Sequence, residues 1–378
     1  MKTLIATVTA GAGHLQAAFA LEEAWRKLRP RDTVERLDVL DFTPRLYRKA
    51  YVESYVKLVE HAPDLWSLLF KKTDDPRLAR KLTRSRRTLT KLATSKFTQH
   101  LQRFQPDAVL CTHFMPLEIL ARLKAKTGSA HSPFTVSVVT DFEAHALWME
   151  PDVDLYCVAA EETKARLVAR GADAGTVAVT GIPVSLKFSC PVSLPAIRKR
   201  MGLRDDLPTL LVLSGGFGMG PAAQILGELN KLTKPLQIVV VCGRNEELRR
   251  ELAVLERRHP THVLGFVTNM HELMAVSDLV ITKPGGLTSS EALAMGRPIF
   301  VLNPIPGQEA ANSDFLLEHG AAAKANRVED LPFRLEQLIG SPKLAAMAKA
   351  AKALGKPQAA AKVCREVLAR LEKPDVAG

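Results

Sequence analysis

Two glycine turns in the second half of the chain carry residue types that bind phosphate. Residues 279–302 (LVITKPGGLTSSEALAMGRPIFVL) predict a short strand, a turn at 283–286, a helix capped by Thr288 or Ser289, and a further strand. Such a turn presents free backbone N–H groups and the positive end of a helix dipole to an anion. Glu291, expected in the first turn of that helix, is placed to bind the ribose of a nucleotide.

The second turn, residues 214–221 (SGGFGMGP), follows the first predicted strand of the same half. Its glycines permit close approach of the backbone to a ligand. A tight strand-to-helix turn without a ligand explains this stretch equally well when it is taken alone, but two such turns in one half favour a nucleotide. No Gly-Lys-Ser/Thr follows, which disfavours a P-loop ATPase.

A third glycine turn, residues 9–14 (TAGAGH), lies near the start of the chain between a predicted strand at 3–8 and a helix at 15–28. Strand, glycine turn and helix in this order are typical of a Rossmann-like unit. A dinucleotide fingerprint would require glycine at position 16, where the chain has Gln16, so NAD binding is disfavoured.

These turns are expected to be held by two α/β domains, the usual outcome for a chain of 378 residues. Residues 1–186 and 187–350 are predicted to form one domain each, and residues 351–378 a C-terminal helix that packs on either. A connector rich in Pro, Ser and Arg is expected at 187–207. Short apolar runs predict the strands 3–8, 34–39, 108–112, 135–140, 155–159, 209–213, 237–242, 262–264, 279–282 and 299–302.

Composition excludes several classes of protein. No run approaches the roughly 20 apolar residues of a transmembrane helix, and residues 1–9 predict a first strand rather than a signal peptide. The five cysteines are scattered and form no Cys-x-x-Cys pair, which indicates a reducing compartment and no cysteine metal site.

The net charge of +12 is concentrated in residues 44–103, which hold 15 Lys/Arg against 5 Asp/Glu, a surplus of 10. The same segment has aromatic and leucine side chains at helical spacing, a composition typical of a surface that lies on anionic lipid. A solvated helical pair whose apolar stripe is core explains it equally well. Nucleic acid is a weaker alternative, because no recognised nucleic-acid module is present.

Six motifs together resemble the monogalactosyldiacylglycerol synthase family, which includes bacterial diacylglycerol glucosyltransferases and is related to the lipid II N-acetylglucosaminyltransferase. They cover nearly the whole chain in the family's order. One departure is Ala12, where the family commonly has glycine. The motifs are GAGH at 11–14, TDFxxHxxW at 140–148, GIPV at 181–184, SGGFGMG at 214–220, KPGGLTxxE at 283–291 and PGQExxN at 306–312.

The resemblance implies a GT-B fold, in which two Rossmann-like domains face each other across a cleft. It also implies inverting transfer of galactose or glucose from a UDP-sugar, without a metal or other cofactor. Glu291 would then bind the ribose, and Gln308 and Glu309 on a loop would bind the sugar. The other donor-binding residues carried over are Gly13, Gly216, Phe217, Gly218, Met219, Gly286, Leu287 and Thr288 for the turns and diphosphate, with Phe266 and Val267 for the uracil.

A transferase needs a base near the acceptor hydroxyl. His14, at the end of the first glycine turn, is the preferred candidate, because an imidazole titrates near neutral pH. Asp141 is the second candidate, although an Asp at this position also serves as a helix N-cap. His145 and Trp148 are expected near the acceptor.

Diacylglycerol as acceptor would give the basic segment a purpose, because that lipid stays in the bilayer. We therefore expect a cytoplasmic protein bound peripherally to the anionic inner face of the cell membrane, with no nucleic-acid partner. Another lipid-linked acceptor, a UDP-sugar epimerase of similar fold and a non-catalytic UDP-sugar-responsive protein remain as alternatives.

Overall fold

The structure, a computed structural model, describes residues 1–9, 11–75, 93–128, 132–214, 221–302 and 304–372. The chain forms two compact units. Unit 1 is Met1–Leu186 with Pro306–Gln308 and Gln358–Gly378, and unit 2 is Lys187–Ile305 with Glu309–Pro357. Each unit contains one six-stranded parallel sheet with alternating helices, so the prediction of two Rossmann-like α/β units is confirmed.

The sheet of unit 1 has the strand order β2-β1-β3-β4-β5-β6. Its residues alternate between two buried clusters, with Leu4 and Ala6 in one and Ile5 in the other, as expected for a parallel sheet covered on both faces. The strands are β1 (Lys2–Thr7), β2 (Thr33–Asp38), β3 (Ala108–Cys111), β4 (Phe134–Val138), β5 (Leu155–Val158) and β6 (Val177–Val179).

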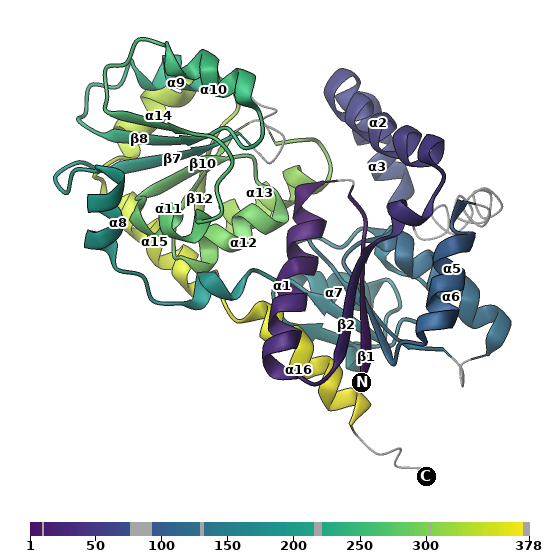
Figure 1. The fold of residues 1–378 in the computed structure, drawn as a ribbon. Helices are drawn as coiled ribbons and strands as arrows, with labels where there is room; N and C mark the ends of the chain where they lie inside the picture. The colour runs from purple at the N-terminus through teal and green to yellow at the C-terminus, as the bar shows by residue number, and fades with distance from the viewer. Residues whose placement is uncertain (10, 76–92, 129–131, 215–220, 303, 373–378) are drawn as a thin grey trace. The chain divides into compact units, whose positions relative to one another are not determined.

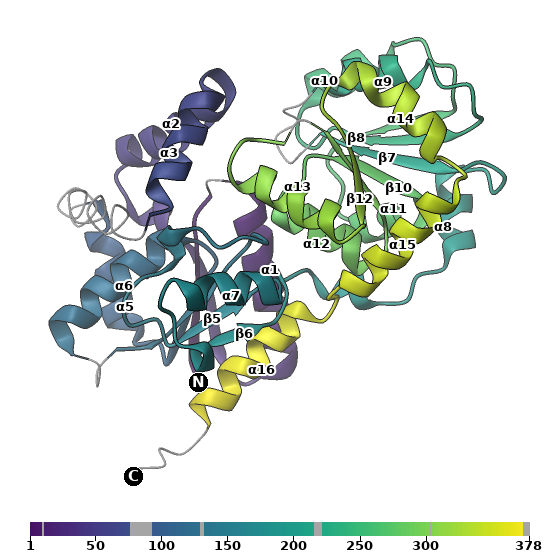
Figure 2. The same ribbon diagram turned by 180° about the vertical axis from the view of Figure 1, so that it is seen from behind.

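Helices α1 (Ala12–Leu28) and α16 (Ala359–Leu371) lie side by side against one face of this sheet (Figures 1 and 2). Val363 and Cys364 of α16 are fully buried, and Lys362 Nζ donates to the carbonyl of Val179, 2.7 Å away. The C-terminal helix is therefore part of unit 1. The expected boundary at residue 350 falls inside α15 (Pro342–Leu354), and unit 2 ends at Pro357.

The opposite face of the unit 1 sheet is covered by α5 (Ser95–Phe104), α6 (Phe114–Thr127) and α7 (Glu161–Ala169). Two further helices, α2 (Arg45–His61) and α3 (Pro63–Thr73), follow the short helix η1 (Val39–Phe42). Tyr47 and Tyr51 of α2 pack against the core, whereas several leucines of α2 and α3 are exposed. Other short helical turns in unit 1 are η3 (Ala146–Trp148) and η4 (Ala174–Thr176).

Unit 2 has the strand order β12-β11-β10-β7-β8-β9. The strands are β7 (Thr209–Leu213), β8 (Gln237–Val241), β9 (Thr261–Leu264), β10 (Leu279–Thr282), β11 (Ile299–Leu302) and β12 (Ala322–Ala325). The remaining elements are η5 (Leu186–Ser189), α8 (Leu194–Met201), α9 (Ala222–Leu229), α10 (Glu246–Ala253), α11 (Met270–Val276), α12 (Gly286–Ala294), α13 (Gln308–Glu318), η6 (Val328–Asp330) and α14 (Leu331–Leu338).

Each sheet has a point where the strand order reverses, between β1 and β3 in unit 1 and between β7 and β10 in unit 2. Ligands of open α/β sheets bind beyond the carboxyl ends of the strands at such a point. His14 follows β1, and the Lys283 turn follows β10. His14 and the Lys283 turn therefore each follow a strand at the point where the strand order of their sheet reverses.

Three local predictions are wrong. The expected connector at 187–207 contains helix α8. Helix α12 begins at Gly286 and is capped by Gly285, not by Thr288 or Ser289, so Glu291 lies in its second turn. Gln308 and Glu309, expected on a loop, are the first two residues of α13, whose N-terminus they help to form.

Candidate functional site

The unit 1 site is built around His14, whose ring is half-buried in the first turn of α1. Its Nδ1 atom lies 2.9 Å from the Thr140 hydroxyl, and its backbone carbonyl accepts a hydrogen bond of 3.0 Å from the hydroxyl of Thr112, at the end of β3. Gly13 is the second residue of the same helix, whose N-cap Gly11 is extended. Ala12, the departure from the family motif, is exposed, so its methyl group is accommodated by solvent.

The bond between Thr140 and Nδ1 determines which nitrogen of His14 can act as a base. A threonine hydroxyl can donate to Nδ1 or accept from it. If Nδ1–H donates to Thr140, the lone pair of the neutral ring is at Nε2, where it can take a proton. Thr140 is 4% exposed, so water does not compete freely for its hydroxyl. The sequence prediction of a base at His14 did not include this partner.

Electrostatics keep His14 largely neutral. Loss of hydration in the fold is the largest influence and lowers the pKa of His14, while the charge of Asp141 and a hydrogen bond with the Thr112 backbone raise it in part. A neutral imidazole at physiological pH is the form that abstracts protons. Asp141 therefore acts on His14 through its charge.

A second histidine, His113, touches His14 and was missed from the sequence. Their ring centroids are 4.9 Å apart with the rings at 85°. Nδ1 of His113 accepts from the Met115 N–H at 3.0 Å, which caps helix α6, and its pKa is lowered well below its ordinary value by burial and then by the charge of His14. Its position after β3, next to β1 at the strand-order reversal, was the available signal.

Trp148, predicted to lie near the acceptor, is close to His14, with ring centroids 6.3 Å apart. It is 4% exposed and also lies against Phe114, 6.4 Å away between centroids. The indole therefore forms a wall beside the imidazole, within the core of unit 1.

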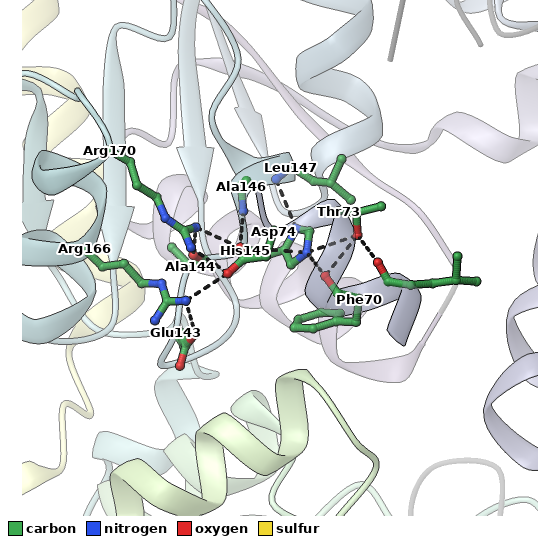
Figure 3. Close-up of polar contacts among 11 residues, drawn as sticks. Phe70, Thr73, Asp74, Glu143, Ala144, His145, Ala146, Leu147, Arg166 and Arg170 are labelled. Carbon is green, nitrogen blue, oxygen red and sulfur yellow. Dashed lines mark hydrogen bonds and ion pairs between the residues drawn. The ribbon is translucent and has the colours of Figure 1, made fainter. Parts of the chain in front are cut away.

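His145, expected near the acceptor, is a buried connection between segments (Figure 3). Its Nδ1 accepts from the Leu147 N–H at 3.1 Å, which caps η3, and its Nε2 lies 3.0 Å from the Phe70 carbonyl at the end of α3. Because Nδ1 accepts, Nε2 carries the proton of the neutral ring and donates to Phe70. Burial lowers the pKa of His145. Both nitrogens are thus occupied, which argues against a role as base.

The unit 2 site lies at the N-terminus of α12. The N–H of Ser289 is the first to bond within the helix, to the Gly285 carbonyl at 2.9 Å. The N–H groups of Gly286, Leu287 and Thr288 therefore have no acceptor inside the helix. They are available to an anion, and the helix dipole adds to the attraction.

Glu291 lies on the same helix, and none of its carboxylate oxygens makes a hydrogen bond with the part of the chain that the structure describes. Burial raises the pKa of Glu291 to about 8. A carboxyl group in such surroundings gains stability from a partner with hydroxyl donors. This is the chemistry expected of a ribose-binding residue.

A hollow lies at the carboxyl ends of β7 and β10, and the first turn of α9 lines it with Ala222 and Ile225. Its wall includes Ser214, Pro221, Thr282 and Lys283. Gly216, Phe217, Gly218 and Met219, predicted to bind the donor, lie outside the described residues. The hollow is therefore bordered on one side by the ends of the segment that was predicted to cradle phosphate.

Phe266 and Val267, the predicted uracil-binding residues, follow the edge strand β9 of unit 2. Phe266, after β9, is 57% exposed, with Val267 partly buried beside it. The guanidinium carbon of Arg244, a residue that the sequence did not single out, lies 5.1 Å from the centroid of the Phe266 ring. An exposed aromatic ring backed by a cation offers a face on which a base can stack.

Glu309 has a partner within its own helix start. Its Oε2 accepts from the Ile305 N–H at 2.8 Å, which stabilises the N-terminus of α13. Gln308 precedes it as the first residue of the helix. The binding of sugar hydroxyls by this pair stays a prediction.

Two further properties bear on function. Within the described part of the chain, no helix is long and apolar enough to cross a membrane. The same residues contain no group of three or more His, Cys, Asp or Glu side chains that could hold a metal ion.

Comparison with known proteins gives consistent matches over both units. A family model described as monogalactosyldiacylglycerol (MGDG) synthase matches residues 14–184, and one described as glycosyltransferase family 28 C-terminal domain matches residues 209–363. A processive diacylglycerol beta-glucosyltransferase of Bacillus pumilus is 32% identical, over 87% of this chain and 84% of its own. A protein of the same description from Bacillus cereus is 31% identical, over 97% of this chain and 93% of its own.

Solved structures match in fold. MurG of Acinetobacter baumannii has a TM-score of 0.63 at 15% identity, covering 97% of this chain and 99% of its own. HepE of Anabaena, in complex with UDP-glucose, has a TM-score of 0.58 at 14% sequence identity. The match covers 98% of this chain and 100% of the HepE chain. A UDP-GlcNAc 2-epimerase of Neisseria meningitidis has a TM-score of 0.59 at 17% sequence identity. The match covers 98% of this chain and 100% of the epimerase chain. The fold is thus GT-B, and it does not by itself choose between transferase and epimerase chemistry.

Proposed function

The chain belongs to the monogalactosyldiacylglycerol synthase family, and from this premise we propose that it transfers glucose from UDP-glucose to the hydroxyl of diacylglycerol, forming a glycolipid. The observation that carries the proposal is sequence identity above 30% with diacylglycerol glucosyltransferases over most of both chains. Glucose is preferred to galactose because those relatives are described as glucosyltransferases. Galactose is the alternative donor sugar.

The donor site that we propose is the N-terminus of α12 together with the hollow at the carboxyl ends of β7 and β10. The N–H groups of Gly286, Leu287 and Thr288 stabilise the diphosphate, and Glu291 binds the ribose hydroxyls. Phe266 and Val267 border the uracil, and Gln308 with Glu309 contact the hexose. The leaving diphosphate is stabilised by these backbone donors, so we expect no requirement for a metal ion or other cofactor.

The acceptor chemistry that we propose centres on His14. Its Nε2 removes the proton of the diacylglycerol hydroxyl as that oxygen attacks the anomeric carbon. The bond between this carbon and the diphosphate oxygen breaks, its electron pair leaves on UDP, and the anomeric configuration inverts. Asp141 stabilises the imidazolium that forms, because its charge favours the protonated ring.

The membrane surface that we propose is the exposed face of α3. Leu65, Leu68 and Leu69 are 50%, 49% and 41% exposed, and Lys72 lies on the same helical face at the next turn. Leucines flanked by lysine suit the boundary of an anionic bilayer. Peripheral binding at the inner face of the cell membrane would bring the acceptor to unit 1.

The test is an assay of lipid products. Purified protein is incubated with diacylglycerol vesicles and either UDP-glucose or UDP-galactose, and the lipids are separated by thin-layer chromatography. We expect a glucosylated lipid, with equal yield in the presence of EDTA. A galactosylated product would reassign the sugar, and loss of activity in EDTA that Mg²⁺ restores would contradict the metal-independent mechanism. No glycolipid from either donor, with turnover of UDP-GlcNAc instead, would favour an epimerase.

A further inference from the structure

Asp74, the residue directly after α3, lies at the centre of a half-buried cluster of charges within unit 1 (Figure 3). Both Arg170 nitrogens bond its two oxygens, at 2.8 and 2.6 Å, and Arg166 adds a contact of 2.9 Å. The carboxylate also accepts from the Ala146 N–H at 2.9 Å. Two-pronged contacts between arginine and carboxylate fix orientation as well as distance. The side chains of Asp74 and Arg170 are only 18% and 16% exposed.

Asp74 contacts residues 140–148 through the Ala146 N–H. The end of α3 contacts the same segment at a second point, His145. His145 Nε2 donates to the Phe70 carbonyl at 3.0 Å and lies 3.4 Å from the Thr73 hydroxyl. Its ring also packs against that of Phe70, with centroids 4.4 Å apart. The last turn of α3 and the segment 140–148 are therefore one bonded structure (Figure 3).

The same segment contacts the proposed base. Thr140, at its start, bonds Nδ1 of His14, and Trp148, at its end, lies against the His14 ring. Asp74 does not touch His14. It contacts the segment that orients His14, through the Ala146 N–H.

Helix α3, which Asp74 links to residues 140–148, carries exposed leucines. Leu68 and Leu69 lie within two turns of Asp74, and Lys71 and Lys72 are exposed beside them. Asp74 accepts four hydrogen bonds at this junction, and placing these charged groups in the fold costs hydration. A glycine or an exposed polar residue would end the helix without that cost.

Resting on the proposed function, we propose that Asp74 is a positioning residue for the lipid acceptor. It fixes α3, where the bilayer binds, to the segment 140–148, so that lipid seated on α3 is presented at a set distance from His14. Binding of the bilayer to α3 is transmitted through Asp74 to the residues that orient the base. This connection matters for an acceptor held in a membrane, and much less for one that diffuses in from water.

The test compares two acceptors and two kinds of variant in the full chain. Asp74→Asn keeps the shape of the side chain and removes its charge. Arg170→Lys keeps the positive charge and loses the two-pronged contact with Asp74. This second variant tests the same contact should Asp74→Asn fail to fold. Asp41→Asn is the matched control, because Asp41 pairs with Arg48 on the surface of the same unit, with both side chains about half exposed. Circular dichroism and UDP affinity verify that each protein is folded.

With dioleoylglycerol in phosphatidylglycerol vesicles, we expect Asp74→Asn to lose about tenfold or more in kcat/KM, because misplacement of a reacting group by about 1 Å costs up to 10²-fold. We expect Arg170→Lys to lose less in kcat/KM than Asp74→Asn, and Asp41→Asn to keep the wild-type kcat/KM. With monomeric dihexanoylglycerol the losses are much smaller, and vesicle co-sedimentation is unchanged. Equal loss on both acceptors would reduce Asp74 to a structural role and overturn the proposal.

Hydrogen exchange separates this proposal from the proposed function, because it does not depend on turnover. Phosphatidylglycerol vesicles should slow amide exchange in α3 and in residues 140–148 of the wild-type chain. In Asp74→Asn they should slow it in α3 alone. Protection confined to α3 in the wild-type chain would refute the connection, even if glycolipid is made. Protection of both segments would support it, even if the acceptor proves to be another lipid.

Discussion

The Thr140 hydroxyl lies 2.9 Å from Nδ1 of His14. Thr140, just after the end of β4, therefore orients the imidazole ring at the start of α1 and selects its tautomer. Thr140→Val keeps the shape and removes the hydroxyl. We expect kcat to fall about tenfold or more, because a base in the wrong tautomer loses most of the 10²–10⁴-fold contribution of general base catalysis. Thr140→Ser should restore most of it.

Nitrogen-15 NMR of the histidines checks the reason for this loss. The wild-type spectrum should show His14 with its proton on Nδ1, and Thr140→Val should move the proton population toward Nε2. A loss of kcat without any change of tautomer would contradict the role of Thr140.

Asp141→Asn distinguishes the two candidates for the base. If His14 is the base, activity requires its neutral form, and kcat/KM rises with pH through the His14 pKa. The charge of Asp141 raises that pKa, so its removal moves the acidic limb of the profile to lower pH. The profile of kcat/KM between pH 4.5 and 8 measures the shift. If Asp141 itself is the base, activity instead disappears at every pH.

Glu291 should couple donor binding to proton release. Its pKa of about 8 means that the carboxyl group is mainly protonated at neutral pH in the free protein. Ribose hydroxyls bind the ionised form better, so UDP affinity should rise between pH 6.5 and 8.5 and a proton should be released on binding. Calorimetry in two buffers of different ionisation enthalpy measures this proton.

Glu291→Gln should abolish that proton release and weaken UDP binding by about 10- to 100-fold, the usual worth of hydrogen bonds to a charged group. Glu318→Gln, an exposed position at the end of α13, is the control and should bind UDP normally. Proton release that persists in Glu291→Gln would assign it to another group.

Replacing Leu65 and Leu68 together by serine should weaken binding to phosphatidylglycerol vesicles. Each half-exposed leucine contributes about 1 kcal/mol when buried in lipid, so partitioning falls by about 10- to 30-fold. Val254→Ser, a substitution of an apolar residue that is 84% exposed in unit 2, should have no effect. Flotation measures binding. Equal binding of the wild-type chain to neutral vesicles at low salt would remove the electrostatic part of the proposal.

The sequence predicted the central strands well because each is a continuous apolar run. The ranges predicted for β7, β10 and β11 are those observed. Strands β6 (VAV) and β12 (AAKA) were missed, because they are short strands at the sheet edges and β12 has no β-branched residue. The cap of α12 was misplaced, because an extended glycine needs no side chain to begin a helix.

Candidate site residues followed the same division. His14 and Glu291 could be proposed from the sequence because glycine turns mark them, and their roles stay predictions. Thr140, His113 and Asp74 acquire their roles through contacts with residues 72 to 126 positions away or on neighbouring strands, and no local pattern encodes such partners. Thr140 stood within a predicted motif, but the neighbouring Asp141 has the more reactive side chain and drew the assignment.

Helix α16 has a consequence for how the protein is made. The ribosome completes the six strands of unit 1 early, yet the apolar surface of α1 and the sheet that α16 covers stays open until Val363, Cys364 and Val367 are synthesised. Unit 2 is synthesised in full during that interval. The nascent first unit therefore waits with an open apolar surface for nearly half of translation, and it is exposed to chaperone capture and to aggregation until the last helix closes it.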